Sequence, residues 1–253
     1  MNTPATIAIR EIEDLAEMRE VERLQKEIWG VEDLDVYPAL ALKPQKEVGA
    51  ILIGAFTEGR MVGFVFGFPG ILNGETIIHS DMLGILAKYR SNNLGFLLKC
   101  AQREAALKLG IKRITWTFDP LQSRNAHLNF NKLGVIADRY YVDYYGVTSS
   151  FLHRFGTDRL WVTWLLESES VKSRLQLNPS PRVVHDQDIV IEIPAEITEN
   201  HEHWRVTTRE AFTRALDAGY VVEEFYVTQR EDQKVGQYIL RAADKRGLKT
   251  NVD

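Results

Sequence analysis

The segment 90–95, which has the sequence Arg-Ser-Asn-Asn-Leu-Gly, constrains the fold of this chain more than any other stretch. Residues 76–86 before it form an apolar run typical of a strand. Residues 94–109 after it repeat apolar side chains at helical spacing, and Gly110 ends the pattern. A strand, a tight polar turn and a helix start bring several backbone N–H groups to one point. Together with the helix dipole, these donors favour an anion such as a phosphate, and an ordinary strand-to-helix turn is the alternative.

Composition is that of an ordinary globular protein. The 253 residues suffice for one large domain, or for one domain and a smaller one. Hydrophobic residues make up 45% and charged residues 26%, so the chain can bury a sizeable core. The net charge of −4 gives no basic surface, which argues against a nucleic-acid partner.

Cysteine usage and hydropathy predict a cytoplasmic protein without a membrane partner. Cys100 is the single cysteine, so no intrachain disulfide can form among these residues. It lies among the apolar residues of the predicted helix 92–109, and we interpret it as a buried space-filler. No run approaches the ~20 apolar residues of a membrane span, and residues 1–10 lack a signal-peptide pattern.

The order of predicted elements indicates a mixed α/β fold. A run of strands with hairpin turns precedes a strand–helix–strand crossover, which predicts a mixed sheet. The expected strands are 6–12, 50–56, 61–68, 76–86, 113–118, 135–145 and 159–166, and the expected helices are 14–29, 37–46 (interrupted at Pro44), 92–109 and 124–133.

Two prolines, at positions 179 and 181, predict a boundary between a first domain (1–177) and a smaller C-terminal one (182–253). The second part shows strand patterns at 188–193, 220–228 and 236–240 and a helix pattern at 204–218. This small α/β module is expected to pack on the first domain or on a partner subunit, since so short a piece buries little surface by itself.

Two segments resemble the GNAT superfamily of acyl-CoA-dependent N-acyltransferases. Residues 90–95 stand where that family has R/Q-x-x-G-x-G/A, and residues 125–134 (Asn-Ala-His-Leu-Asn-Phe-Asn-Lys-Leu-Gly) resemble its N-x-x-A…Y-x-K-L-G-F helix. The resemblance covers roughly residues 5–166. Asn93 replaces a usual glycine, but asparagine tolerates a left-handed backbone better than other side chains.

Further blocks are similar to a subgroup of predicted GNAT acetyltransferases of unknown substrate. They are 116–121, 157–160 with Trp164, and 192–195, so the likeness extends into the C-terminal module.

The resemblance implies a GNAT-like, mostly antiparallel sheet with a V-shaped split, flanked by helices. It also implies acetyl-CoA or coenzyme A as co-substrate, with no metal. The residues it assigns to the pyrophosphate are Arg90, Ser91, Asn92, Asn93, Leu94 and Gly95. Those it assigns to the pantetheine arm are Leu83, Gly84 and Ile85, and Asn125 matches the Asn that begins the helix after the split.

Each of these residues also has a plain structural interpretation. Gly84 inside an apolar strand marks a bulge, a close approach of another backbone, or simple packing. Arg90 can be a solvated turn cation, and Asn125 can be a helix N-cap.

Catalytic candidates come from two strands. His79 and Asp81 lie two residues apart, which predicts one face of the strand and suits a general base for an amine. A structural histidine is the alternative. The family often uses a tyrosine as general acid toward the sulfur, but the matching position is Phe130. Tyr141 is the candidate substitute among the four tyrosines of residues 140–145, which are otherwise packing or edge residues.

The implied function is transfer of an acyl group, most simply acetyl, to an amine of a small-molecule or peptide acceptor by direct attack. The alternative is a non-catalytic CoA-binding regulatory module, motivated by Phe130.

Asp119 and the pair Asp158–Arg159 are minor candidates for amine or substrate contacts, and turn or salt-bridge roles are favoured for them. Aromatic residues of the C-terminal module can cover the acceptor pocket, form a homodimer face, or simply form its core.

Overall fold

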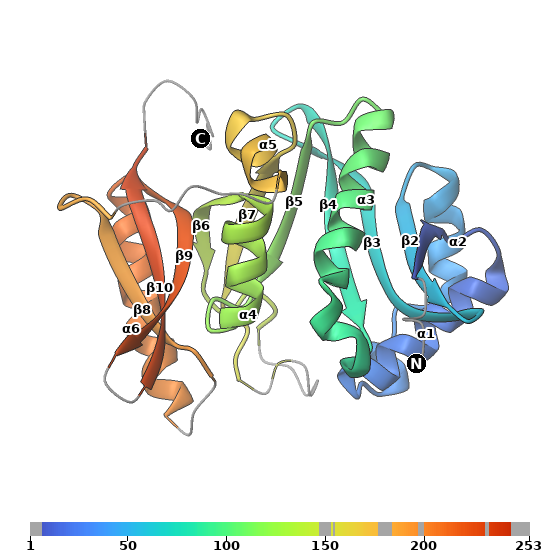
Figure 1. The fold of residues 1–253 in the computed structure, drawn as a ribbon, viewed down its shortest axis with the longest axis horizontal. Coiled ribbons are helices and arrows are strands. Elements are labelled where there is room, and N and C mark those ends of the chain that lie inside the picture. The colour runs from blue at the N-terminus through green and yellow to red at the C-terminus, as the bar shows by residue number, and fades with distance from the viewer. Residues whose placement is uncertain are drawn as a thin grey trace, which may run out of the picture. The chain divides into compact units, whose positions relative to one another are not determined.

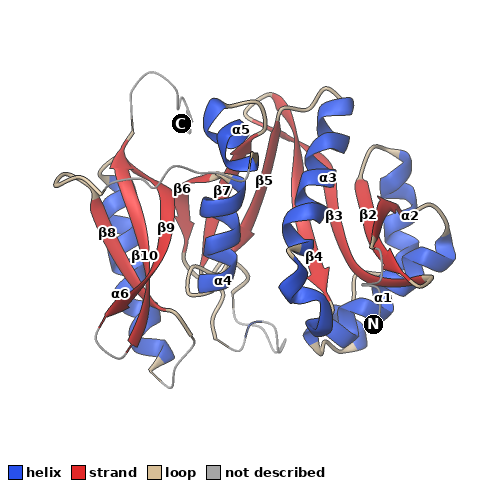
Figure 2. Ribbon diagram, viewed as in Figure 1, coloured by secondary structure: helices blue, strands red, loops and turns tan. Residues whose placement is uncertain are grey.

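The computed structural model describes residues 7–146, 153, 155–176, 184–196, 200–230 and 233–243. The chain divides into two compact units: unit 1 is Met1–Ile114 with Ser149–Arg154, and unit 2 is Thr115–Thr148 with Phe155–Asp253. Both contain strands and helices, and every strand pair with a described register is antiparallel. The described residues hold six α-helices (Figures 1 and 2). The fold is therefore mixed α/β with a mostly antiparallel sheet, as predicted. The predicted boundary at 178–181 lies outside the described residues.

Unit 1 is a four-stranded antiparallel arrangement in the order β1-β2-β3-β4. Its strands are β1 (Ala8–Glu11), β2 (Ile51–Thr57), β3 (Arg60–Leu72) and β4 (Glu75–Ile85). Its helices are α1 (Leu15–Trp29), α2 (Ala39–Glu47) and α3 (Leu94–Lys108), with short 3₁₀ segments η1 (Asp33–Asp35) and η2 (Ala87–Asn92).

Alternation along β3 explains how helices cover both faces of this sheet. Phe64 and Phe66 point to one face, where they are fully buried with residues of α1 and α2 such as Met18. Gly67, of opposite parity, faces Gln102 of α3. Figure 2 shows α3 crossing in front of β3 and β4.

The structure extends α2 beyond its predicted interruption. Pro44 lies inside the helix, which continues to Glu47. A proline at this point removes only the N–H that would bond the carbonyl of Leu40, one turn earlier. Leu40 lies on the exposed side of the helix, where water can solvate that carbonyl.

Unit 2 has the strand order β5-β7-β6-β9-β10-β8, with β5 starting in the last residues of unit 1. Its strands are β5 (Arg113–Phe118), β6 (Ile136–Tyr141), β7 (Arg159–Leu165), β8 (Ile189–Pro194), β9 (Tyr220–Arg230) and β10 (Gln233–Ala242). Its helices are α4 (Ser123–Ala126), the π-helical η3 (His127–Leu133), α5 (Glu169–Leu175) and α6 (His201–Asp217).

Two predicted elements of unit 2 differ from the structure. The strand predicted over 135–145 ends at Tyr141, because the chain turns through Asp143, whose φ is 47°. The helix predicted over 124–133 is one α-turn followed by wider π-helical turns. The sequence pattern repeats at helical spacing and does not distinguish these two windings over so few turns.

The C-terminal strands and α6 form one compact unit with β5–β7. β9 pairs with β6 at Val222 and Ala137. The hydroxyl of Tyr238 on β10 donates a hydrogen bond of 2.6 Å to the Pro120 carbonyl, next to the end of β5. The ring of Phe212 on α6 stacks on Tyr140 of β6 at 5.5 Å between centroids. The predicted C-terminal module therefore shares its core with the end of the predicted first domain.

Two arginines one turn apart on α6 pair with the half-buried Asp119 and the buried Asp158. Arg205 donates to both oxygens of Asp119, at 2.7 and 2.9 Å. Arg209 donates to both oxygens of Asp158, at 2.9 and 2.8 Å. Burial by itself would raise the pKa of Asp158, but hydrogen bonds from Arg209, a backbone N–H and the Tyr140 hydroxyl hold this pKa below its usual value. Both carboxylates are thus engaged in structural ion pairs.

We expect Arg205→Met to lower the free energy of unfolding by about 2 kcal/mol, because the half-buried Asp119 then keeps its charge without its ion partner. Arg230→Met is the matched control: Arg230 pairs with Glu192 at 2.9 Å, but its side chain is 70% exposed. That exposed pair should contribute at most about 1 kcal/mol. Urea unfolding of both variants measures the difference, and equal losses would contradict the structural role of Arg205.

Candidate functional site

Strand β4 contains one extra residue opposite β3. Phe66 pairs with Met82 and Gly67 pairs with Ser80, so Asp81 has no counterpart on β3. Such a β-bulge bends the strand and redirects the side chains around it. The sequence resemblance led us to expect a bulge near Gly84, and the structure has it three residues earlier.

The bulge changes which residues share a face. His79 pairs with Phe68 and Met82 pairs with Phe66, so both lie on the face that α1 and α2 cover. Simple alternation predicted one face for His79 and Asp81, and that argument fails because the alternation is interrupted at Asp81. Asp81 is exposed, whereas the His79 ring lies 5.6 Å from the Phe68 ring.

The two candidate bases have shifted pKa values. Burial and, to a smaller extent, the positive charge of Lys99 lower the pKa of His79 to about 4. The imidazole is therefore neutral at pH 7. Reduced hydration raises the pKa of Asp81 above its usual value.

Gly84 is required by close packing. It pairs with Phe64, and a Cβ added to it would lie 2.8 Å from the Phe64 ring and 3.0 Å from the side chain of Ile28 on α1. The sequence left three interpretations of Gly84 open, and these side-chain contacts support packing. Leu83 and Ile85 beside it are half-buried.

The turn before α3 has the backbone shape that the sequence predicted. Asn93 adopts a left-handed conformation, with φ 56° and ψ 16°. The carbonyl of Asn93 accepts a hydrogen bond of 3.2 Å from Leu97 N–H, so residues 94–96 form the first helical turn, whose N–H groups have no partner within an α-helix itself. Leu94 is buried and anchors this turn, while Gly95 is half-buried.

Arg90 is exposed, and its Nε donates a hydrogen bond of 3.1 Å to the carbonyl of Ile85, at the end of β4. This contact ties the turn to the strand. The side chains of Ser91 and Asn92 lie outside the described part of the chain.

A buried polar cluster lies between α3 and β4. Lys99 Nζ donates to Ser80 Oγ at 2.9 Å and to Gln102 Oε1 at 2.8 Å, and Ser80 Oγ donates to the same Gln102 oxygen at 2.9 Å. Nothing in the sequence analysis singled out these residues, because a lysine and a glutamine in an amphipathic helix are normally on its solvent face. Cys100 beside them is half-buried, and burial raises the pKa of its thiol to about 11. The thiol is thus protonated and unreactive at neutral pH.

The remaining predicted residues lie in unit 2. Asn125 is exposed at the third position of α4, whose N-cap is Gln122, so Asn125 is not the N-cap. Phe130 is fully buried between the rings of Phe118 and Tyr238. Tyr141 is half-buried in an aromatic cluster, with its ring 5.2 Å from Tyr144 and 6.2 Å from Trp161.

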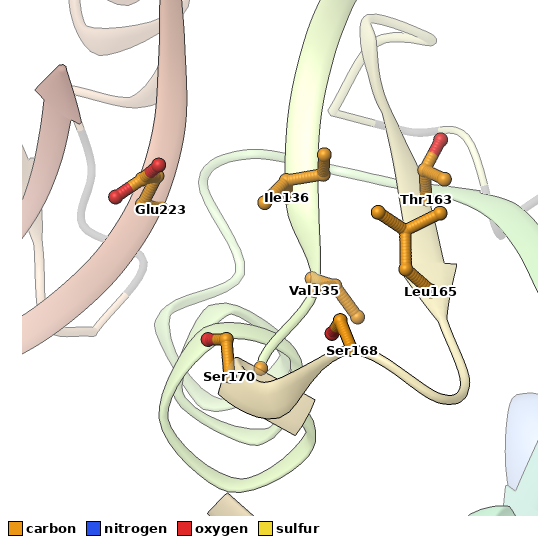
Figure 3. A pocket seen from close by; sticks show the side chains of 8 residues that line it. Val135, Ile136, Thr163, Leu165, Ser168, Ser170 and Glu223 are labelled. Atoms are coloured by element: carbon orange, nitrogen blue, oxygen red, sulfur yellow. The ribbon is translucent and has the colours of Figure 1, made fainter. Parts of the chain in front are cut away.

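Unit 2 also contains a pocket of about 180 Å³ near the point where β6 and β9 meet. Figure 3 shows aliphatic side chains along it, with Ser168 and Ser170 at the start of α5 and Glu223 on β9. None of the residues predicted for the site lines this pocket.

Two absences concern the described residues. These residues contain no group of three or more His, Cys, Asp or Glu side chains arranged to hold a metal ion. Within the same residues, no helix has both the length and the apolar character needed to span a membrane.

No protein-family model matches the sequence, and no curated protein matches it. Solved structures do match the fold. An aminoglycoside 6′-acetyltransferase of type Ii is 17% identical, with a TM-score of 0.52 over 64% of this chain and 99% of the other. A GNAT-family acetyltransferase from Streptococcus pneumoniae is 20% identical, with a TM-score of 0.50 over 62% and 98% of the two chains.

Naa50 from Arabidopsis thaliana, in complex with a bisubstrate analogue of CoA and a peptide, is 15% identical with a TM-score of 0.50, over 62% of this chain and 97% of the other. At these identities the likeness concerns the backbone alone. The chain has the fold of the GNAT acetyltransferases.

Proposed function

We propose that this protein transfers an acyl group, most simply acetyl, from acyl-CoA to an amine by direct attack in a ternary complex. The observation that carries the proposal is the left-handed Asn93 turn, which opens α3 directly after the bulged strand β4 of a GNAT fold. In this proposal, residues of the turn and of β4 bind CoA, and His79, Asp81 and Tyr141 act in catalysis.

Diphosphate binding follows from the geometry of the turn. Asn93 takes the backbone conformation that glycine takes most easily, and the first-turn N–H groups of Leu94 and Gly95 then point beyond the helix start. Gly95 has no side chain to keep a phosphate away. Arg90, exposed and held against the end of β4, adds positive charge beside this turn. These groups suit the pyrophosphate of CoA.

The segment Leu83–Ile85 suits the pantetheine arm. It follows the bulge at Asp81, where regular pairing with β3 is offset by one residue. We propose that backbone groups of this segment bond the amides of the arm and that an N–H near Ile85 stabilises the oxyanion formed when the amine attacks. Asn125, exposed on α4, is proposed as a further CoA contact.

His79 and Asp81 are the proposed bases for the acceptor amine. The neutral imidazole of His79 can accept a hydrogen bond from an amine or from a water molecule, although a low pKa gives little driving force for full proton transfer. Asp81 is more accessible, and its raised pKa moves it toward the range of a useful base. A water molecule between the acceptor and either group would complete the transfer.

The leaving sulfur receives no proton from position 130. Phe130 lacks a hydroxyl, and the hydroxyl of Tyr140 already donates to Asp158 at 2.7 Å. Tyr141 remains the proposed acid. A CoA thiolate, with a pKa near ~8.5, can also leave without full protonation, so the reaction is slower but not prevented.

The structural neighbours suggest the acceptor class. One acetylates aminoglycosides, and another was solved with a CoA–peptide analogue. A small-molecule or peptide amine is the corresponding proposal for this chain. The second candidate function, a CoA-binding regulatory module without turnover, is favoured by the buried apolar Phe130.

Calorimetry with CoA and turnover with acetyl-CoA separate these functions. Release of free CoA thiol in the presence of a panel of aminoglycosides, polyamines and peptides supports the enzyme. CoA binding without thiol release across the panel supports the module. If CoA does not bind at high micromolar concentrations, both candidates fail.

Asn93→Val should weaken CoA binding by about tenfold, because a β-branched residue in a left-handed conformation costs about 1–2 kcal/mol and the turn shifts to relieve it. Asn93→Gly should keep wild-type affinity. Asn73→Val is the matched control, since Asn73 has φ 52° in the β3–β4 hairpin turn. It should reduce stability similarly while CoA affinity, measured by calorimetry, stays unchanged. Equal affinity losses in both valine variants would contradict the role of the Asn93 turn.

The low pKa of His79 predicts how stability depends on pH. The folded value is about 4 and the unfolded value 6.5, so between these pH values the unfolded chain binds more protons. Stability therefore falls as pH drops from 6.5 to 4, by about 3 kcal/mol from this group. His79→Gln should lack that part of the loss, as measured by urea unfolding at pH 7 and pH 4.5. Parallel pH profiles for both proteins would show that His79 titrates normally.

A further inference from the structure

The polar cluster of Lys99, Ser80 and Gln102 is unusual for its position. The side chains of Lys99 and Gln102 come from α3, and that of Ser80 comes from β4. Lys99 is 3% exposed, Ser80 6% and Gln102 0%. Lysine is almost never buried to this extent. The two groups shown to accept its hydrogen bonds are a hydroxyl and an amide oxygen, which carry no charge.

The cluster forms a closed triangle. Nζ, Oγ and Oε1 lie 2.8–2.9 Å from one another, so each heavy atom contacts the other two. The fully buried Gln102 Nε2 has no hydrogen-bond partner within the described residues. The Gln102 amide is therefore held through its oxygen. The contacts of that oxygen with Lys99 and Ser80 determine where the amide lies.

The backbone of β3 is shaped to admit this amide. A Cβ on Gly67 would lie 2.8 Å from Gln102 Nε2 and 2.9 Å from the carbonyl of His79. Gly67 pairs with Ser80, the last regular pair before the extra residue Asp81. The glycine, the cluster and the bulge therefore occupy one place on the sheet.

Packing alone does not explain a lysine here. Methionine has a similar volume and length and would fill the same space without the cost of burying an amine, and such replacements of buried charged groups are often neutral or stabilising. Burial also lowers the pKa of Lys99 well below its usual value, which reflects that cost. A costly buried group next to a redirected strand is typical of functional positions.

We propose that Lys99 is a positioning residue: with Ser80 and Gln102 it clamps β4 at the bulge, and so fixes the backbone of Leu83–Ile85 on which acyl transfer would depend. The role in catalysis rests on the proposed function, whereas the clamp itself does not. Lys99 acts through Ser80, which directly precedes the bulge residue, and touches neither acyl group nor acceptor in this scheme.

The test compares Lys99→Met and Lys99→Gln with Lys108→Met, an exposed lysine in the last turn of the same helix. Lys99→Met should retain the wild-type melting temperature or exceed it and lower kcat at least tenfold, with a smaller loss of CoA affinity because the diphosphate turn before α3 is unchanged. Lys99→Gln keeps an N–H donor and should fall between Lys99→Met and wild type. Lys108→Met should match wild type in every measurement.

Amide hydrogen exchange tests the clamp without relying on activity. In Lys99→Met, the amides of residues 80–83 should exchange at least tenfold faster, while those of β2 keep their protection. Unchanged exchange at residues 80–83 in a folded Lys99→Met protein overturns the proposal.

The two proposals fail in different ways. If wild type does not bind CoA, the proposed function fails and exchange still decides the clamp. If wild type turns over acetyl-CoA and Lys99→Met has the same kcat, the positioning role in catalysis is refuted while the proposed function stands.

Discussion

The extra residue in β4 is the constraint on which the candidate site of unit 1 depends. A regular strand would place residues 79, 81 and 83 on one face, but Asp81 shifts this pattern and puts His79 and Met82 together. The strand is held on both sides of this irregularity. Phe68 packs against His79 on the face of α1 and α2, and Lys99 bonds Ser80 on the face of α3. Side chains of β3, β4 and α3 therefore hold β4 on both sides of its extra residue.

Unit 2 contains ion pairs that join α6 to the sheet, whereas unit 1 contains the buried polar cluster of Lys99, Ser80 and Gln102. Arg205 and Arg209 on α6 each bind one carboxylate in a two-pronged contact, and these carboxylates follow β5 and precede β7. The sequence blocks 116–121 and 157–160 contain Asp119 and Asp158, so the carboxylate that each block contributes is engaged in an ion pair with α6.

Local signals in the sequence were sufficient for most elements. Strand β5 was predicted with its observed bounds, and the left-handed turn at Asn93 was expected because Asn93 stands where the resembled family has glycine. The position of the bulge escaped prediction because one extra residue leaves the apolar run unchanged while reversing the faces beyond it. The ion pairs of α6 join residues 86 and 51 positions apart, and no periodic pattern encodes such a distance. Lys99 was missed for a related reason. It is buried against strand β4, and the pattern of apolar residues along the helix gives no information about that strand.

Under the proposed function, Phe130 would affect the rate of acyl transfer and not the binding of CoA. The ring is enclosed by Phe118 and Tyr238, and the nearby Tyr238 hydroxyl already donates to the Pro120 carbonyl. A hydroxyl added at position 130 would enter an apolar core and would itself need a partner, so a tyrosine there would not simply restore an acid. The groups proposed to hold CoA are backbone donors of α3 and β4, which no side chain at position 130 supplies. Under the proposed function, affinity for CoA and the speed of thiol release would therefore depend on different residues.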